Sequence, residues 1–505
     1  MNINQNNNKE KSNFDSLCID IFKNNNLIIT SHRGPIDLLE NNNNITTKKS
    51  GTTASTAFGE LINKVSFSWI TNPTKDIERK LAENENNNSI PISSNEPTKI
   101  IRYINSSRRA YHKYYNIICN PLLWYLHHQM WNFPYNPNID ENIQDAWING
   151  YVHINENFAN TILEEIKIQN NNPIIIIQDY HLYLVPELIR KVNKNCFIHY
   201  IIYTPWTSSR NWAMLPTYIR NPILTSLLCS NLIVFQTRDD ARNFLNCCEE
   251  FLSDITIDYQ NLSVIYKNHS VKLNIAPISI NIKEIDSLAN STPVTTYKKE
   301  LEQLSTESTI VRIDRAEPTK NILRGFEAYK IMLEKEKHLL NKVTFLAFLA
   351  PSRLHISQYK RYLIEVENKI NEINIKFQTK TWKPIIPFYE NNYARALAGL
   401  KIYDVFLQNA TIDGTNLVTK QAPIVNEKNG TIILSETSSV SKELTDYVIK
   451  VAPTDIAGTA TALYQSLITK ETDRKNNYKN IIEYIESHDN KSWIRTQLQW
   501  IRELL

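Results

Sequence analysis

The run Pro173-Ile174-Ile175-Ile176-Ile177-Gln178-Asp179 decides the fold class of this chain. Its four consecutive isoleucines leave no polar face, which is typical of a β-strand covered by helices on both sides. The segment Phe197–Pro205 has the same character and is interrupted at His199. Segments with helical periodicity, such as Leu184–Lys194, lie between these strands. The sequence therefore predicts a doubly wound α/β sheet.

The same alternation begins again after a predicted hinge at Ala276–Ile280. Two doubly wound, Rossmann-like domains, residues 15–276 and 277–473, are therefore expected to face each other across a cleft. Residues 1–14 form an Asn-rich tail that we expect to be disordered. The strands expected in the second half are Thr309–Asp314, Val343–Pro351, Ile385–Tyr389, Val405–Asn409 and Thr431–Glu436.

Composition excludes several classes of protein. The 505 residues carry 56 Lys and Arg against 52 Asp and Glu, a net charge of +4, so a nucleic-acid partner is not expected. No apolar run reaches the roughly 18–20 residues that span a bilayer, and the start lacks the apolar core of a signal peptide. The six cysteines form no CxxC pair, which predicts a reducing, cytoplasmic location and no metal centre. With only nine glycines, we expect each where the backbone requires it.

The first candidate site follows the strand Thr309–Asp314. Arg315 and Lys320 stand five residues apart on a strand-to-helix loop, where two cations beside a helix N-terminus favour a diphosphate. The alternative is a solvated loop whose charges pair locally.

A second candidate site, Asp413-Gly414-Thr415-Asn416-Leu417-Val418, follows the strand Val405–Asn409 and begins a helix. Gly414 permits close approach of a ligand to the backbone, and the next amides point towards it. An Asp-Gly turn alone is common and is weak evidence for a binding site. Its value is its position, because it follows a strand in the same half of the chain as Arg315.

Two further groups lie mainly in the first half. Asp179 follows a buried strand and suits a hydroxyl acceptor role, although a helix N-cap is an equal alternative. Aromatic rings and arginine forks suit a phosphorylated sugar, although each residue alone could be packing or surface. This last group consists of Arg33, Tyr115, Trp124 and Arg353.

Taken in order, these motifs resemble the trehalose-6-phosphate synthase family, the family 20 glycosyltransferases, from about Leu27 to the C-terminus. The stretches Ala422–Glu427 and Leu434–Thr437 are more similar to the validoxylamine 7′-phosphate synthase pseudoglycosyltransferases. The resemblance implies a GT-B fold without cofactor or metal. It also implies that the second domain holds a nucleotide-sugar, linked to UDP or GDP, and that the first holds a sugar phosphate. Residues 474–505 would then be helices that cross back to the first domain.

The resemblance also implies a role for each candidate residue. Arg315 and Lys320 would bind the donor diphosphate as catalytic groups, and Asp179 would face the acceptor as a third. The acceptor phosphate pocket would contain Arg33, Tyr115, Trp124 and Arg353. The donor would contact Gly51, Tyr203, Asp413, Gly414, Asn416, Leu417, Val418 and Gln421.

Three positions depart from the family pattern. Tyr203 replaces a His that contacts the donor sugar, Gln421 replaces a ribose-binding Glu, and Gln178 replaces a His before Asp179. The leading expectation is a retaining transfer of a glucose-like ring. The alternatives are coupling of a nucleotide-cyclitol to an aminocyclitol phosphate, or a non-catalytic sugar-phosphate-binding protein. The sequence leaves the nucleotide base and the oligomeric state open, a homo-oligomer included.

Overall fold

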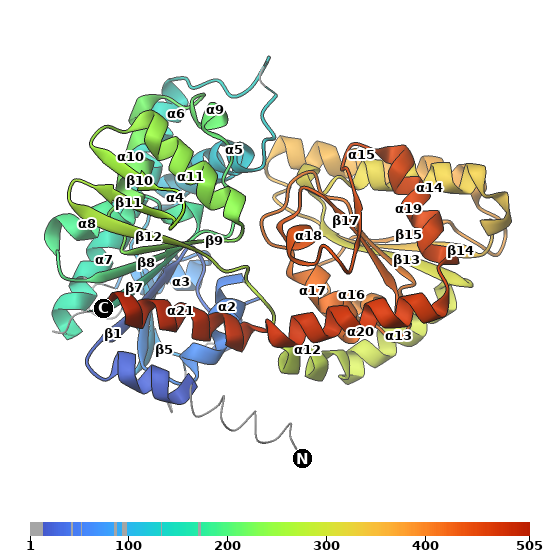
Figure 1. Ribbon diagram of the computed structural model, residues 1–505, viewed down its shortest axis with the longest axis horizontal. Helices are drawn as coiled ribbons and strands as arrows, with labels where there is room; N and C mark the ends of the chain where they lie inside the picture. Colours follow the sequence, from blue (N-terminus) through green and yellow to red (C-terminus); the bar gives the residue numbers. More distant parts are fainter. Residues whose placement is uncertain are drawn as a thin grey trace. The chain divides into compact units, whose positions relative to one another are not determined.

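The computed structural model describes residues 14–41, 44–51, 53–84, 88–92, 98–132, 134–169 and 173–505. The chain forms two compact units (Figure 1). Unit 1 is the chain up to Ile278 together with Asn490–Leu505, and unit 2 is Ser279–Asp489. Of the tail predicted to be disordered, residues 1–13 lie outside the described residues.

Unit 1 is built on a sheet whose described strands follow the order β10-β11-β12-β9-β8-β7-β1-β4-β6-β5. The isoleucine run forms β7, paired in parallel with β1 and β8. Its core is parallel, and β5, β10 and β11 add antiparallel pairs at the two edges. The strands are β1 (Asn26–Ser31), β4 (Phe67–Thr71), β5 (Ser89–Pro91), β6 (Lys99–Tyr103), β7 (Pro173–Gln178), β8 (Phe197–Ile201), β9 (Leu232–Phe235), β10 (Ile255–Asp258), β11 (Ser263–Tyr266) and β12 (His269–Ile275).

Several elements of unit 1 were not expected from the sequence. Besides β4, β5, β6, β10 and β11, these are the hairpin β2 (Ile36–Asn41) and β3 (Asn44–Lys49), and the π-helix η1 (His112–Trp124). Helix η1 carries both Tyr115 and Trp124 and contains Pro121. A proline has no N–H to donate, which disturbs regular α-helical bonding. Wide π-turns of this kind are frequent at functional sites.

Unit 2 contains a fully parallel sheet with the order β15-β14-β13-β16-β17-β18. One apolar cluster lies under α14 (Ile322–Lys335), α15 (Ser357–Phe377) and α19 (Ile456–Ile468). A second lies under α12, α13, α16, α17 and α20, so helices cover both faces (Figure 1). This confirms the doubly wound prediction. The strands are β13 (Ser308–Arg315), β14 (Val343–Ala350), β15 (Ile385–Phe388), β16 (Val405–Gln408), β17 (Thr431–Ser435) and β18 (Ile449–Val451). The helices of the second face are α12 (Ile282–Ala289), α13 (Thr292–Leu304), α16 (Tyr393–Ile402), α17 (Leu417–Val425) and α20 (Glu471–Ser487).

The last helix, α21 (Asn490–Leu504), completes unit 1. The indole Nε1 of Trp493 donates to the carbonyl of Ala276 at 3.0 Å. The amide of Asn490 donates to the carbonyl of Ala57 in α2 (Thr53–Ile62) at 3.1 Å. The boundary predicted between residues 473 and 474 falls inside α20, which belongs to unit 2.

Candidate functional site

The strand-end loop after β13 carries the first candidate pair. A single 3-10 turn, Pro318–Lys320, follows the strand, and Asn321 takes a left-handed conformation (φ 56°) that starts α14. The ammonium Nζ of Lys320 lies 2.6 Å from Oδ2 of Asp413. The structure thus brings the first two predicted motifs into direct contact.

A buried ion pair supports this loop from inside the sheet. Nε of Arg312, which is fully buried, lies 2.7 Å from Oδ2 of Asp314. Nη2 of the same arginine donates to the carbonyl of Lys320. Burial raises the pKa of Asp314, and the charges of Arg312 and Lys320 oppose that rise. The loop backbone is therefore held by a charge-assisted hydrogen bond from the core.

The second motif is ordered around its own carboxylate. Nδ2 of Asn416 donates to Oδ2 of Asp413 at 3.2 Å, and its Oδ1 accepts from the backbone N–H of Thr419. Asn416 therefore caps α17 and orients Asp413 with one side chain. Gly414 is buried, and Leu417 and Val418 form the first turn of α17.

Gln421 lies one turn further along α17 and is 8% exposed. Burial raises the pKa of the Tyr393 phenol to about 12, and the side chain of Gln421 opposes that rise. The preceding Lys420 forms a buried pair with Glu443 at 2.7 Å. Burial lowers the pKa of Lys420, and Glu443 opposes the change. Gln421 thus lies on the helix that the Asp413 loop begins.

Glu317 is a site residue that the sequence reasoning missed. Its fully buried Oε1 lies 2.7 Å from Nη1 of Arg315 and 3.0 Å from Nη1 of Arg353, which follows β14. Burial raises the pKa of Glu317, but the charges of Arg315 and Arg353 outweigh that effect and bring it to about 2. Its position two residues after Arg315 was the one feature of the sequence that could have indicated a partner for that arginine. Arg353 is thereby placed in unit 2 beside the predicted donor residue.

In unit 1, Asp179 occupies the end of β7 in an unusual backbone conformation. Its φ of 68° and ψ of 172° lie in a region that favours glycine. Burial raises the pKa of its carboxyl group to about 7, against the opposing effect of three nearby backbone N–H groups. Its Oδ1 is buried and accepts no hydrogen bond from the described residues. The structure gives Asp179 no N-cap hydrogen bond, which removes that alternative.

A cluster of stacked rings lies beside Asp179, and two of its members, His32 and His181, were not predicted as site residues. His32 stacks on Tyr115 at 4.7 Å and on His181 at 4.6 Å between ring centroids. Nδ1 of His181 lies 4.0 Å from Oδ2 of Asp179. Trp124 packs on Tyr180 at 5.8 Å. Tyr115 and Trp124 therefore belong to one aromatic cluster beside Asp179, joined through Tyr180 and His181, whose ring centroids lie 4.0 Å apart.

Other predicted residues of unit 1 lie in different surroundings. The guanidinium of Arg33 is half exposed and pairs with Asp37 at 3.2 Å. Gly51 is exposed, with no atom within 4 Å of the place a Cβ would take. The phenol of Tyr203 is buried and donates to Oε1 of Gln178 at 3.0 Å. Two of the three departures from the family pattern thus bond to each other.

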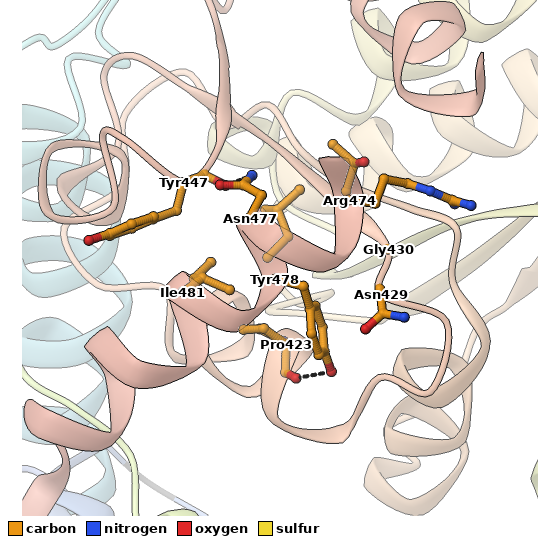
Figure 2. A pocket seen from close by; sticks show the side chains of 10 residues that line it. Pro423, Asn429, Gly430, Tyr447, Arg474, Asn477, Tyr478 and Ile481 are labelled. Atoms are coloured by element: carbon orange, nitrogen blue, oxygen red, sulfur yellow. Dashed lines mark hydrogen bonds between the residues drawn. The ribbon is translucent and has the colours of Figure 1, made fainter. Parts of the chain in front are cut away.

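A separate small cavity of about 20 Å³ lies in unit 2, where α20 packs on the end of α17 (Figure 2). The hydroxyl of Tyr478 donates to the carbonyls of Pro423 and Asn426, the latter at 2.6 Å. This volume holds about one water molecule, and none of the predicted site residues lines it.

Within the described ranges, no three His, Cys, Asp or Glu side chains are grouped closely enough to hold a metal ion. The same residues contain no helix that is long and apolar enough to cross a bilayer. All six cysteines are free thiols.

Comparison with known proteins identifies the group to which this architecture belongs. Alpha,alpha-trehalose-phosphate synthase (UDP-forming) of Pichia angusta is 29% identical over 392 residues, covering 75% of this chain and 78% of that protein. Validamine 7-phosphate valienyltransferase of Streptomyces hygroscopicus subsp. jinggangensis is 25% identical over 436 residues, covering 86% and 85%. A structure described as trehalose-6-phosphate from E. coli bound with UDP-2-fluoro glucose has a TM-score of 0.80 at 22% identity, covering 95% of this chain and 98% of that one.

The structural likeness confirms a GT-B fold built from two Rossmann-like units. The family model for glycosyltransferase family 20 matches residues 24–503, nearly the whole chain, and confirms the resemblance inferred from the motifs. The chain is therefore a member of glycosyltransferase family 20.

Proposed function

We propose that this protein transfers glucose from UDP-glucose to glucose 6-phosphate with retention of configuration, forming a phosphorylated disaccharide. The observation that carries the proposal is the contact between the two strand-end motifs of unit 2, where Lys320 meets Asp413 and Arg315 lies on the same loop. The UDP-forming synthase from Pichia angusta supports this choice of donor and reaction.

In this reaction, Arg315 and Lys320 stabilise the diphosphate as it departs. Negative charge develops on the leaving oxygen, and fixed cations bind it more strongly in the transition state than in the ground state. The departing phosphate oxygen takes the proton of the acceptor hydroxyl on the same face of the ring. Asp413 and the backbone of Gly414–Val418 face the donor, and Gln421 contacts its ribose. Gly51 and Tyr203 complete the proposed donor site.

In this proposal the acceptor is bound by a carboxylate, by aromatic rings and by arginines. Asp179 faces the acceptor hydroxyls, and its carboxyl oxygen without a hydrogen-bond partner among the described residues is suited to accept one. Tyr115 and Trp124 contact the ring. Arg33 and Arg353 bind the phosphate through bidentate hydrogen bonds.

The test is a transfer assay with the purified protein, UDP-glucose and glucose 6-phosphate, reading UDP release and the disaccharide phosphate by mass spectrometry. GDP-glucose in place of UDP-glucose tests the base. We expect product with UDP-glucose. Absence of product with both donors would refute the proposal.

A second candidate is the coupling of a nucleotide-cyclitol to an aminocyclitol phosphate. It is favoured by the similarity to the valienyltransferase over 86% of this chain. Offering the nucleotide-cyclitol and the aminocyclitol phosphate in the same assay separates the two reactions.

A third candidate is non-catalytic binding of a sugar phosphate, which the buried hydrogen bond between Tyr203 and Gln178 favours. Stabilisation by glucose 6-phosphate without any effect of UDP would support that third reading.

We further expect the protein to work in a reducing cytoplasm, since its six thiols are unpaired. A homo-oligomer remains part of the proposal, and sedimentation analysis would test it.

A further inference from the structure

Two arginines of the candidate site share a single carboxylate oxygen. Nη1 of Arg315 lies 2.7 Å from Oε1 of Glu317. The same oxygen accepts hydrogen bonds from Nη1 of Arg353 at 3.0 Å and from the hydroxyl of Ser352 at 2.7 Å. The other oxygen, Oε2, is buried and accepts no hydrogen bond from the described residues. One oxygen therefore fixes the place of both guanidinium groups.

Glu317 is buried, and its backbone is hydrogen-bonded within the loop. Glu317 is 0% exposed, and its backbone N–H bonds to the carbonyl of Arg315 at 2.8 Å. Its carbonyl accepts from the N–H of Lys320 at 3.0 Å. The side chain of Arg315, in contrast, is 45% exposed. A long exposed side chain loses much rotamer entropy when it binds a ligand, and a buried partner removes part of that cost beforehand.

The second arginine is constrained through its backbone. Arg353 adopts a φ of 48°, a left-handed conformation that side chains other than glycine rarely take. Such a conformation persists where surrounding contacts fix it. The bonds from Arg353 to Glu317 and to the phenol of Tyr359 at 3.2 Å are contacts of that kind.

Charge explains why a carboxylate is needed at this point. Two guanidinium groups close to one oxygen repel each other unless a negative charge lies between them. A neutral side chain would leave two cations that spread apart.

We propose that Glu317 is a positioning residue that joins Arg315 and Arg353 into one phosphate-binding pair, so that recognition of both substrates depends on the same carboxylate. The inference rests on the proposed function, in which Arg315 binds the donor diphosphate and Arg353 the acceptor phosphate. It predicts that a change at Glu317 weakens the binding of both substrates in parallel, although Glu317 itself contacts neither substrate.

The test is calorimetric titration of the full-length protein with UDP and, separately, with glucose 6-phosphate. We expect Glu317→Gln to raise both dissociation constants about tenfold and Glu317→Asp, which keeps the charge, to raise both about threefold. Arg353→Lys should weaken the binding of glucose 6-phosphate and leave the binding of UDP unchanged. In the double variant with Glu317→Gln, the two effects on glucose 6-phosphate should be less than additive.

Glu165→Gln is the matched control. Glu165 is a buried carboxylate in unit 1 that pairs with Arg102 at 3.2 Å. Its loss should lower the melting temperature without changing either dissociation constant. If Glu317→Gln fails to fold, Glu317→Asp alone tests the inference, because it too should raise the dissociation constants of UDP and glucose 6-phosphate together.

The outcomes separate this inference from the proposed function. Affinities of the Glu317 variants within twofold of the native protein, or a change in one substrate only, overturn the inference even if transfer occurs. Parallel weakening in a protein that shows no transfer supports the inference and refutes the proposed reaction. A native protein that binds neither UDP nor glucose 6-phosphate refutes both.

Discussion

Arg315 is the residue whose removal bears most directly on the proposed chemistry. Its guanidinium is half exposed, so it can meet a ligand while Glu317 holds one of its nitrogens. We expect Arg315→Ala to lower kcat/KM by about 2–4 kcal/mol in transition-state free energy, the usual cost of one charge-stabilising donor. Steady-state kinetics with both substrates varied would measure this.

Lys376→Ala provides the comparison for that variant. Lys376 lies near the end of α15 and pairs with Glu334 on the surface. Its loss removes one positive charge from the same unit but no proposed ligand, so kinetics should remain at the native level. Near-native kinetics for Arg315→Ala itself would contradict its assigned role.

Asp179 gives the protein a pH-dependent stability. Burial raises its pKa to about 7, far above the usual value near 4. Between these two values the folded state holds a proton that the unfolded state has lost, so stability falls as pH rises. Asp179→Asn stays neutral throughout. Its stability relative to the native protein should therefore increase by about 3 kcal/mol between pH 5 and pH 8.

Urea unfolding at several pH values would measure this difference. Asp446→Asn, at an exposed position of unit 2, should show no such trend. A difference between Asp179→Asn and the native protein that is constant with pH would mean that Asp179 is ionised throughout the range.

At the scale of elements, the packing of α14 on β13 depends on Gly325. A Cβ at this position would collide with Nη1 of Arg312, which is fully buried and supports the Lys320 carbonyl. We expect Gly325→Ala to destabilise the protein by about 1–3 kcal/mol, the usual cost of overpacking. Gly59→Ala, in α2 with no neighbour within 4 Å, should instead stabilise it by about 0.5–1 kcal/mol.

Denaturant unfolding of the two variants would measure the expected fall in the free energy of unfolding for Gly325→Ala and the expected rise for Gly59→Ala. Equal effects would show that Arg312 can move aside without cost. Gly325→Ala should also weaken UDP binding, since the displaced arginine no longer supports the loop that carries Lys320.

The scarce glycines do not serve the backbone in the way their rarity suggested. No described glycine has a positive φ, whereas Asn268, Asn321, Asn341 and Asn429 do. Asparagine tolerates the left-handed region because its side chain bonds locally to the backbone. Five glycines instead lie where a Cβ would come closer than 3 Å to another atom: Gly150, Gly325, Gly399, Gly430 and Gly458.

Apolar patterning predicted the strands that are buried on both faces, such as β7 and β8. It missed β6 because Lys99 and Arg102 interrupt the apolar pattern. Arg102 is nevertheless buried, since Glu164 and Glu165 of α7 (His153–Gln169) pair with it. Such compensation comes from residues about sixty positions away, and no local pattern contains it.

The candidate site was predictable to the extent that strand ends define it. The contact between Lys320 and Asp413 follows from two motifs after neighbouring strands, β13 and β16, of one parallel sheet. Glu317 was missed because an acidic residue in a polar loop gives no sign that it is buried. His32 and His181 were missed because the ring cluster joins three separate segments of unit 1, those of His32, Tyr115 and His181.

At the scale of the whole molecule, the two units differ in continuity. Unit 2, Ser279–Asp489, is one uninterrupted stretch with apolar clusters on both faces of its sheet. We expect this fragment to fold by itself and to bind UDP. At a UDP concentration one hundred times its dissociation constant, stability should rise by about 2.7 kcal/mol, visible in a thermal shift.

The matching fragment, residues 1–278, should fail to form a stable native unit. It lacks Trp493, whose ring packs edge-on against Phe58 at 5.7 Å and bonds to Ala276. Adding a peptide of residues 490–505 should restore cooperative unfolding. A stable 1–278 fragment that the peptide does not change would contradict this account of α21.

The late position of α21 also sets an order for events at the ribosome. Because translation proceeds from the N-terminus, the first unit must wait for its closing helix until the whole of the second has been made. The nascent chain would carry an incomplete N-terminal body beside a finished later one. Chaperones that shield exposed apolar surface would accordingly be needed longest by the part synthesised first.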